Sequence, residues 1–418
     1  MRATRAFVYL NRFRENIRAV AGLTGKRKIC VPVKADAYGH GALPLARAAL
    51  EAGADFLAVA LVQEGEELRR GGIQAPILLF SQCSDEELGD LAEHNLSPFV
   101  SGPDYIDALA QAARAAGKEL QVHLKVDTGM GRAGCRPEDA AALAGRVLSR
   151  GNLRLAGVAT HLAVSDSRDG AGIAYTGDQL RRFNEAVKAI RAAGIDPGIL
   201  HAANSGGVLY HPDSWFDMVR PGILLYGYGP LPSGPGGQEA ASAASPCQAG
   251  IAVRPLMELR SKVAAVKPVR KGESVSYGRE WTAAKDTLAA LVPAGYADGL
   301  RRGLSGRWRV GIRGRTYPVI GRICMDQCLV DLGAADYSAG YGVAKYGGAG
   351  YGEIVPGDEV LLFGENPAKY GGAAFGDAKY GDAACMAEKL GTIPHEITCG
   401  IGKRVPRIYL DKDPPAGC

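Results

Sequence analysis

The sequence predicts an α/β fold in which an eight-stranded parallel β/α barrel of the TIM type is followed by a mainly antiparallel β domain. Two patterns predict it. Apolar runs alternate with helix-like segments over roughly the first 230 residues, and short runs separated by turn residues fill much of the remainder. A chain of 418 residues is long enough for two or three domains with a large core.

Eight apolar runs in the first part are expected to form the barrel strands. They lie near residues 29–34, 56–61, 76–80, 96–100, 120–126, 155–160, 198–202 and 217–226. Alanine-rich segments with helical spacing lie between them, over residues 43–51, 86–93, 105–116, 140–150 and 179–193. Such barrels carry their chemistry at the carboxyl ends of the strands, which is where Lys34, His161, Ser205 and Arg220 fall.

The expected domains are the barrel over 8–232, a loop or linker rich in Gly, Pro and Ala over 233–250, and the β domain over 251–418. Strand-like runs in the β domain cover 259–269, 287–293, 308–312, 317–320, 328–332 and 359–363. The tetrapeptide Ala-Lys-Tyr-Gly occurs at 344–347, 368–371 and 378–381, within Gly/Tyr-rich insertions near 337–350 and 365–385. Because these copies are irregularly spaced, we interpret them as extended surface loops and not as a solenoid.

Charge and composition exclude several classes of function. The 49 basic and 44 acidic residues are interspersed and leave a formal charge of +5, so nucleic acid is not an expected partner. The sequence contains no twenty-residue apolar segment and no charged-then-apolar leader, so we expect no membrane insertion, no export and a cytoplasmic location. The nine scattered cysteines favour reduced thiols over disulfides or a metal site.

Lys34 is the most informative residue, because it ends an apolar run and is followed four residues later by Tyr38. Burial disfavours an ammonium group, so a lysine at a strand end can be held as a neutral amine that condenses with a carbonyl. Pyridoxal phosphate supplies such a carbonyl. The alternative is a lysine that extends from the strand end to solvent, and this segment alone does not decide between them.

Seven motifs, in order along nearly the whole chain, resemble those of the alanine racemases, which are pyridoxal-phosphate enzymes of fold type III. The matching motifs are Val31 to Gly41, His123 to Arg132, His201 to Ser205, Val219 to Ile223, Val275 to Arg279, Gly295 to Gly299 and Gly321 to Gln327. The resemblance implies interconversion of L- and D-alanine for peptidoglycan synthesis. It also implies a head-to-tail homodimer whose active sites each draw on both chains, with Lys34 as the Schiff-base lysine.

The resemblance also implies which residues bind the cofactor. Hydroxyls of Tyr38 and Ser205 and the backbone N–H groups of Gly222 and Ile223 suit a phosphate dianion. Asn204, next to Ser205 in the same motif, is also expected to be a cofactor-binding residue.

Arg220 matches the residue at the pyridine nitrogen of the cofactor. A guanidinium keeps its proton at neutral pH, so it donates to an unprotonated pyridine and makes the ring a weaker electron sink. His161 resembles the histidine that orients this arginine.

Racemisation removes a proton from one face of Cα and delivers one to the other, so a single base is geometrically insufficient. By resemblance, Lys34 serves one face and Tyr277 of the other subunit serves the opposite face. A free tyrosine titrates near pH ~10, so nearby positive charge must lower the pKa of Tyr277.

The resemblance places the remaining site residues around the substrate. Arg132 matches the residue near the substrate carboxylate, for which a guanidinium fork is well suited. Lys125 matches a lysine that is often carbamylated and could then hold Arg132; a plain structural lysine is the alternative. Substrate contacts are also expected from Tyr296, Cys324, Met325 and Asp326. We expect no metal, although the spacing of Cys324 and Cys328 makes one a weak rival.

Two alternatives remain open at this point. One is a broad-specificity or serine racemase of the same fold, which Lys403 favours because many relatives carry a tyrosine at this position, where it narrows the entrance. The other is a non-catalytic pyridoxal-phosphate-binding protein. Such proteins are usually lone barrels, so the C-terminal region that carries Tyr277 argues against this alternative.

Overall fold

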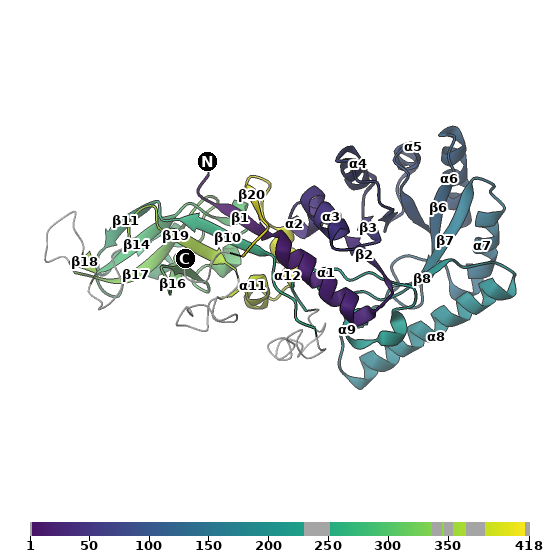
Figure 1. Cartoon of the computed structure of the whole chain (residues 1–418). Coiled ribbons are helices and arrows are strands. Elements are labelled where there is room, and N and C mark those ends of the chain that lie inside the picture. Colours follow the sequence, from purple (N-terminus) through teal and green to yellow (C-terminus); the bar gives the residue numbers. More distant parts are fainter. Residues whose placement is uncertain (1, 230–250, 337–344, 347–353, 365–380, 414–418) are drawn as a thin grey trace. The chain divides into compact units, whose positions relative to one another are not determined.

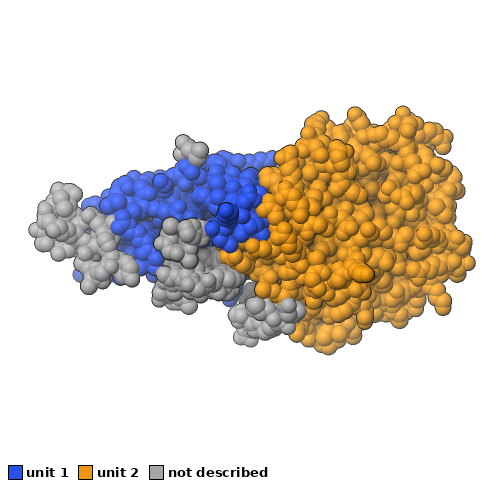
Figure 2. All heavy atoms as spheres, in the orientation of Figure 1, with its two compact units in different colours: residues 1–11, 255–418 blue, residues 12–254 orange. Residues whose placement is uncertain are grey.

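The computed structural model describes the chain except for residues 1, 230–250, 337–344, 347–353, 365–380 and 414–418 (Figure 1). It divides into two compact units, shown in Figure 2: residues 12–254 form one, and residues 1–11 join residues 255–418 in the other. The expected linker at 233–250 lies outside the described residues. Of the two Gly/Tyr-rich insertions, only residues 345–346 and 381–385 are described.

Residues 12–254 form the barrel that the sequence predicts. Its strands are β2 (Lys28–Pro32), β3 (Phe56–Val59), β4 (Ile77–Leu79), β5 (Ser97–Val100), β6 (Leu120–Lys125), β7 (Leu153–Ala159), β8 (Ile199–His201) and β9 (Met218–Val219). They lie in the order β8-β7-β6-β5-β4-β3-β2-β9, and every pairing is parallel. Two further backbone bonds, from Asp217 N to Leu200 O at 3.0 Å and from Arg220 N to Ala203 O at 2.8 Å, bring β8 and β9 together.

Helices lie on the outside of these strands (Figure 1). They are α1 (Leu10–Thr24), α2 (Lys34–Gly39), α3 (Ala42–Glu51), α4 (Val62–Arg70), α5 (Leu88–Glu93), α6 (Pro103–Ala115), α7 (Ala140–Leu148), α8 (Gly170–Ala192) and α9 (Ser205–Tyr210). Strands β3, β4 and β5 are buried at every position, as expected for parallel strands covered on both faces.

Two barrel elements differ from the expected bounds. Helix α8 begins nine residues before the expected Gln179, because the Asp169 side chain caps it by accepting from Gly172 N at 2.6 Å. The apolar run at 217–226 yields only the two-residue β9. Beyond it the backbone turns, with Leu225 N donating to Gly222 O at 2.9 Å.

The second unit is a mainly antiparallel sheet, as predicted. Its strands are β1 (Arg5–Tyr9), β10 (Met257–Lys262), β11 (Ala265–Val269), β12 (Ser274–Val275), β13 (Trp281–Thr282), β14 (Thr287–Val292), β15 (Arg309–Ile312), β16 (Arg315–Ile320), β17 (Cys328–Asp336), β18 (Lys345–Tyr346), β19 (Glu359–Phe363) and β20 (Arg407–Leu410). The large sheet has the order β11-β14-β17-β16-β15-β19-β10-β1-β20, with β18 paired to β17, and β12 pairs with β13. Helices α11 (Ala383–Leu390) and α12 (Pro394–Cys399) complete the unit.

Strand β1 lies in this sheet, antiparallel to β10 and parallel to β20. Residues 8–11, which were expected to begin the barrel domain, therefore belong with the sheet. Tyr9 is fully buried, and its hydroxyl donates to Glu258 at 2.9 Å and accepts from Arg260 at 3.2 Å. A five-residue apolar strand contains nothing that identifies its sheet, which is why the sequence did not reveal this pairing.

No helix among the described residues is long and apolar enough to cross a membrane.

We predict that Tyr9→Phe lowers the free energy of unfolding by about 1.5–3 kcal/mol, because it removes a buried hydrogen bond to a charged group. Chemical denaturation would measure the change. Tyr317→Phe is the matched control, since the Tyr317 hydroxyl makes no hydrogen bond within the described part of the chain. Equal free energies of unfolding for the two variants would contradict a stabilising role for the Tyr9 hydrogen bond that holds β1 in the sheet.

Candidate active site

The predicted cofactor residues of the barrel follow the carboxyl ends of different strands. Lys34 follows β2, His161 follows β7, Ser205 follows β8 and Arg220 follows β9, while Lys125 is the last residue of β6. Parallel strands of a barrel end at one rim, so these residues share the face on which barrels carry their chemistry.

The backbone after Lys34 forms a left-handed turn. Ala35, Asp36, Ala37 and Tyr38 all have φ between 51° and 53°. Left-handed geometry costs an L-residue roughly 1–2 kcal/mol, so the surroundings must hold this turn in place. Ala37 N donates to Val33 O and Gly41 N to Asp36 O, each at 2.8 Å, and the Asp36 carboxylate accepts from Ala42 N at 2.8 Å.

The left-handed turn directs Tyr38 toward the loop after β9. The Tyr38 and Tyr226 rings are 4.6 Å apart, and Tyr226 donates to Pro32 O at 2.8 Å. A Cβ at Gly222 would lie 2.9 Å from the Tyr38 hydroxyl. The loop can approach this hydroxyl so closely only because residue 222 has no side chain.

Ser205 connects the loop to helix α9. Its buried hydroxyl oxygen accepts from Gly222 N at 2.9 Å and from Leu224 N at 3.2 Å. Both lone pairs are therefore used, and the hydroxyl proton is left to donate to a ligand. Gly222 N–H, which was expected to face the phosphate, is directed at Ser205 instead. Ile223 N–H has no hydrogen-bond acceptor within the described residues.

Asn204 has a structural role in this geometry. Its Oδ1 caps α9 by accepting from Gly207 N at 3.0 Å and also accepts from Ser165 at 2.6 Å. Its Nδ2 donates to Leu162 O at 3.2 Å. The amide thus orients Ser205, the first residue of the helix.

Arg220 is a buried cation. It donates from Nη1 to His201 Nδ1 at 2.7 Å, and from Nη2 to Thr160 O at 2.7 Å and Ala202 O at 3.2 Å. Within the described residues no carboxylate pairs with it. Burial lowers the pKa of Arg220 to about 10, so it is still charged at neutral pH.

The expected orienting role of His161 is corrected by this geometry. His201 holds Arg220, and across the described structure no hydrogen bond joins His161 to the guanidinium. His161 lies just beyond β7 and His201 is the last residue of β8, so both lie near the same rim and sequence position alone could not separate them. The relevant signal was that His201 opens the His201 to Ser205 motif.

The direction of the Arg220–His201 hydrogen bond fixes the tautomers of both His201 and His123. Arginine only donates, so His201 Nδ1 must be unprotonated. Burial and the charge of Arg220 hold the pKa of His201 well below its usual value, and the ring is neutral with its proton on Nε2. That Nε2 lies 2.9 Å from His123 Nδ1, which must therefore accept, leaving the His123 proton on Nε2.

The barrel core is built around this pair of imidazoles. His123 is fully buried against the rings of Phe56 and Phe99. A Cβ at Gly157 would lie 2.5 Å from His123 Nδ1, so glycine is required on the neighbouring strand. Burial lowers the pKa of His123 to about 3, and its Nε2 has no partner in the described structure. Sequence reasoning missed His123 and His201 as site residues.

Lys125 is buried close to cations. Its Nζ makes one long contact, 3.5 Å to Val126 O, and burial, with Arg220 as the next cause, lowers its pKa to about 7. Arg132 is exposed and makes no hydrogen bond within the described residues, so Lys125 does not hold it here. Asp127 shapes the loop before Arg132 by accepting from Gly129 N at 2.9 Å and Gly131 N at 3.1 Å.

The other predicted residues lie in the sheet unit and are largely exposed. Tyr277, in a 3-10 turn after β12, is 72% exposed, and Met325 is 52% exposed. Tyr296 and Asp326 are also exposed, and Cys324 is half-buried.

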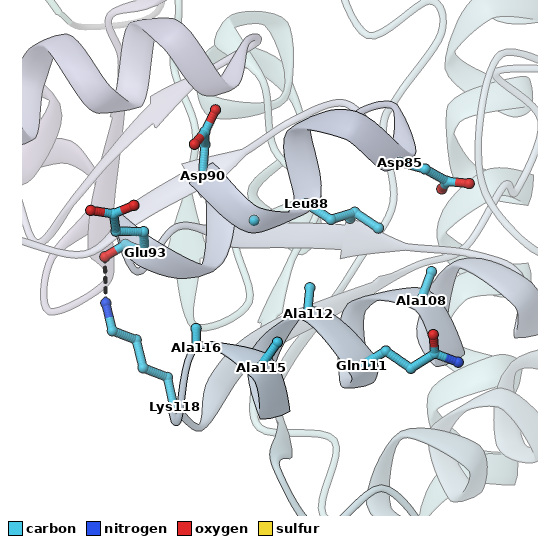
Figure 3. A pocket seen from close by; sticks show the side chains of 11 residues that line it. Asp85, Leu88, Asp90, Glu93, Ala108, Gln111, Ala112, Ala115, Ala116 and Lys118 are labelled. Carbon is cyan, nitrogen blue, oxygen red and sulfur yellow. Dashed lines mark hydrogen bonds between the residues drawn. The ribbon is translucent and has the colours of Figure 1, made fainter.

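A hollow of about 830 Å³ lies elsewhere, between α5 and α6 on the outside of the barrel (Figure 3). Alanines of α6, including Ala108 and Ala112, line it together with Leu88, and Lys118 donates to Glu93 O at its edge. It contains none of the predicted site residues. Throughout the described residues, no group of three or more His, Cys, Asp or Glu side chains is placed to hold a metal.

Comparison with known proteins gives the family. The model of the alanine racemase N-terminal domain matches residues 8–230, and that of the alanine racemase C-terminal domain matches residues 256–409. The chain belongs to the alanine racemase family. The alanine racemase of Treponema denticola is 44% identical over 417 residues, which cover 99% of both chains, and that of Treponema pallidum is 41% identical over 98% of this chain and all of the relative.

Solved alanine racemase structures agree with this assignment. That of Streptomyces coelicolor A3(2) has a TM-score of 0.83 and 37% identity, covering 98% of each chain. That of Streptomyces lavendulae has a TM-score of 0.82 and 36% identity, covering 98% of this chain and 97% of the other.

We predict that His201 and His123 both carry their proton on Nε2 and stay neutral from pH ~8 to ~5, because their pKa values lie well below the usual value. Selective ¹⁵N-histidine NMR would show this, since the chain has only seven histidines to assign. His123→Gln, whose amide oxygen still accepts, should preserve the His201 signal, whereas His123→Leu should not. A proton on His201 Nδ1 in the wild-type chain would contradict the scheme.

Proposed function

We propose that this member of the alanine racemase family is a pyridoxal-phosphate-dependent enzyme that interconverts L- and D-alanine. The observation that carries the proposal is Arg220, a buried cation with no carboxylate partner in the described residues, held by a neutral histidine at the barrel rim that also carries Lys34. The D-alanine product would serve cell-wall peptidoglycan, which implies action in the cytoplasm.

The residues present fit the cofactor. Three of the five guanidinium N–H groups of Arg220 have protein acceptors, so two remain for the pyridine nitrogen. The hydroxyls of Ser205 and Tyr38 and the N–H of Ile223 would bind the phosphate, and glycine at 222 leaves room beside Tyr38. His161, near the charges of Arg220 and Lys34, would contact the cofactor without orienting Arg220.

When bound, pyridoxal phosphate supplies the carbonyl that condenses with amines and a ring that withdraws electrons from Cα. Lys34 would anchor it and exchange a proton at one face of Cα. The Tyr277 hydroxyl of the partner subunit would exchange a proton at the opposite face. The exposure of Tyr277 supports this two-chain arrangement, and therefore a homodimer.

The substrate carboxylate would bind Arg132, with Met325 offering backbone groups and Tyr296, Cys324 and Asp326 bordering the site. Lys125 would assist as a carbamate. A lysine with a pKa near 7 is partly neutral at physiological pH, and only the neutral amine adds to carbon dioxide. The resulting anion would offset the charges of Arg220 and Arg132, which both lower the pKa of Lys125.

We predict that Lys34→Ala and Tyr277→Phe homodimers are nearly inactive in both directions, because each lacks one of the two bases, and that Lys34→Ala also loses the visible absorbance of the bound cofactor. Mixing the two should restore about a quarter of wild-type activity, because half of the dimers become mixed and each mixed dimer has one complete site. Chiral chromatography would measure turnover. No recovery, with subunit exchange verified by mass spectrometry, would show that the two bases come from one chain.

A broader substrate range is the second candidate function, and one observation favours it. Lys403 is exposed, at a position where many alanine racemases carry a tyrosine that narrows the entrance.

We predict that the chain racemises L-serine measurably and that Lys403→Tyr raises its alanine-to-serine preference, by up to roughly 100-fold for one hydroxyl. The ratio of kcat/KM for the two amino acids is the measurement. The same ratio in both proteins would exclude Lys403 as the determinant.

A further inference from the structure

Three segments of the sheet unit are in backbone contact around Tyr296 and Met325. Tyr296 N donates to Cys324 O at 3.0 Å, and Ala297 N donates to Met325 O at 3.1 Å. A Cβ at Gly295 would lie 2.2 Å from Cys324 O, and one at Gly402 would lie 2.3 Å from Ala297 O. Glycine is needed at both positions because the backbones approach so closely.

A fully buried carboxylate, that of Asp298, lies under this contact. It accepts from Gly295 N at 3.0 Å, from Arg404 Nε at 2.8 Å and from Arg2 Nη2 at 2.5 Å. A buried carboxylate is stable only when paired and hydrogen-bonded, so these donors fix where Asp298 lies. Arg2 gives Asp298 a second cation.

The other end of the Arg404 guanidinium contacts the exposed loop. Nη2 pairs with the Asp326 carboxylate at 2.7 Å and lies 3.4 Å from Met325 O. One rigid guanidinium therefore joins the buried Asp298 carboxylate to the Met325 carbonyl and to the Asp326 carboxylate. A lysine is a single point of charge and cannot span both carboxylates in this way.

We propose that Arg404 is a positioning residue that fixes the Met325 loop against Tyr296 and thereby sets how tightly the site fits a methyl side chain. This inference rests on the proposed function, in which Tyr296 and Met325 border the substrate. It assigns Asp326 to holding the loop through Arg404, not to contacting the amino acid.

The test compares Arg404→Lys with Arg307→Lys, an exposed arginine of the same unit that donates to Lys389 O. Because Arg2 still pairs with Asp298, Arg404→Lys should fold. We expect its KM for L-alanine to rise about tenfold with a smaller change in kcat, and its alanine-to-serine preference to fall about tenfold. Arg307→Lys should match the wild type.

Hydrogen exchange of the segment 295–298 gives a readout that does not depend on activity. The amides of Tyr296 and Ala297 should exchange at least roughly tenfold faster in Arg404→Lys. Asp326→Asn, which removes only the exposed ion pair, should shift exchange in the same direction.

Failure of the Arg404 proposal can be distinguished from failure of the proposed function. Unchanged exchange, KM and preference in a folded Arg404→Lys variant would overturn the proposal. Faster exchange with unchanged KM and preference would show a purely structural ion pair and would also overturn it. A wild-type chain that fails to racemise alanine would overturn the proposed function, while the exchange data would still report whether Arg404 holds the loop.

Discussion

The barrel site depends on a charge that has no opposite charge beside it in the described structure. Arg220 keeps its proton although burial lowers its pKa, because three well-placed acceptors replace water around it. Two of those acceptors are main-chain carbonyls at the ends of β7 and β8, so the barrel itself supplies them. The third is an imidazole nitrogen, and only the neutral Nε2–H tautomer of His201 can act in that way. A carboxylate in place of His201 would satisfy the cation more strongly and would compete with any ligand for its remaining N–H groups.

The left-handed turn after Lys34 is a second constraint on the site. Its backbone strain arises because the turn must bring side chains to the rim where Arg220 lies. To bring a lysine and a tyrosine from β2 to the rim that carries Arg220, the chain must reverse direction within a few residues. Four non-glycine residues adopt positive φ to do so, held by the Asp36 carboxylate and by bonds to Val33 and Asp36. The compensating gain is contact between Tyr38 and Tyr226 and the close approach to Gly222. Strain of this kind persists only where the surrounding packing fixes it, and it concentrates at functional sites.

Much of the architecture was predictable because parallel strands in a barrel produce apolar runs of characteristic length, and because the motifs follow those runs. The roles of individual polar groups were less predictable. Sequence placed His161 after a strand and His201 within one, but only the folded barrel shows which imidazole faces Arg220. His123 lies in an apolar strand, where the sequence gives no sign of its role. That role is visible only from its close packing against Gly157 on the neighbouring strand. The place of β1 depended on pairings with strands about 250 and 400 residues away, and such long-range choices leave no local signal.

The two units differ in how they hold the side chains expected at the site. In the barrel the groups expected to hold the cofactor are buried, hydrogen-bonded and fixed before any ligand arrives, which avoids reorganisation when charge develops. In the sheet unit Tyr277, Tyr296 and Met325 project from the surface, and the segments that carry Tyr296 and Met325 are held beneath by Asp298 and Arg404. A tyrosine hydroxyl that acts as a base needs positive charge beside it, because that charge favours the ionised form. In the homodimer proposed above, the partner chain would supply that charge, so assembly would complete the site.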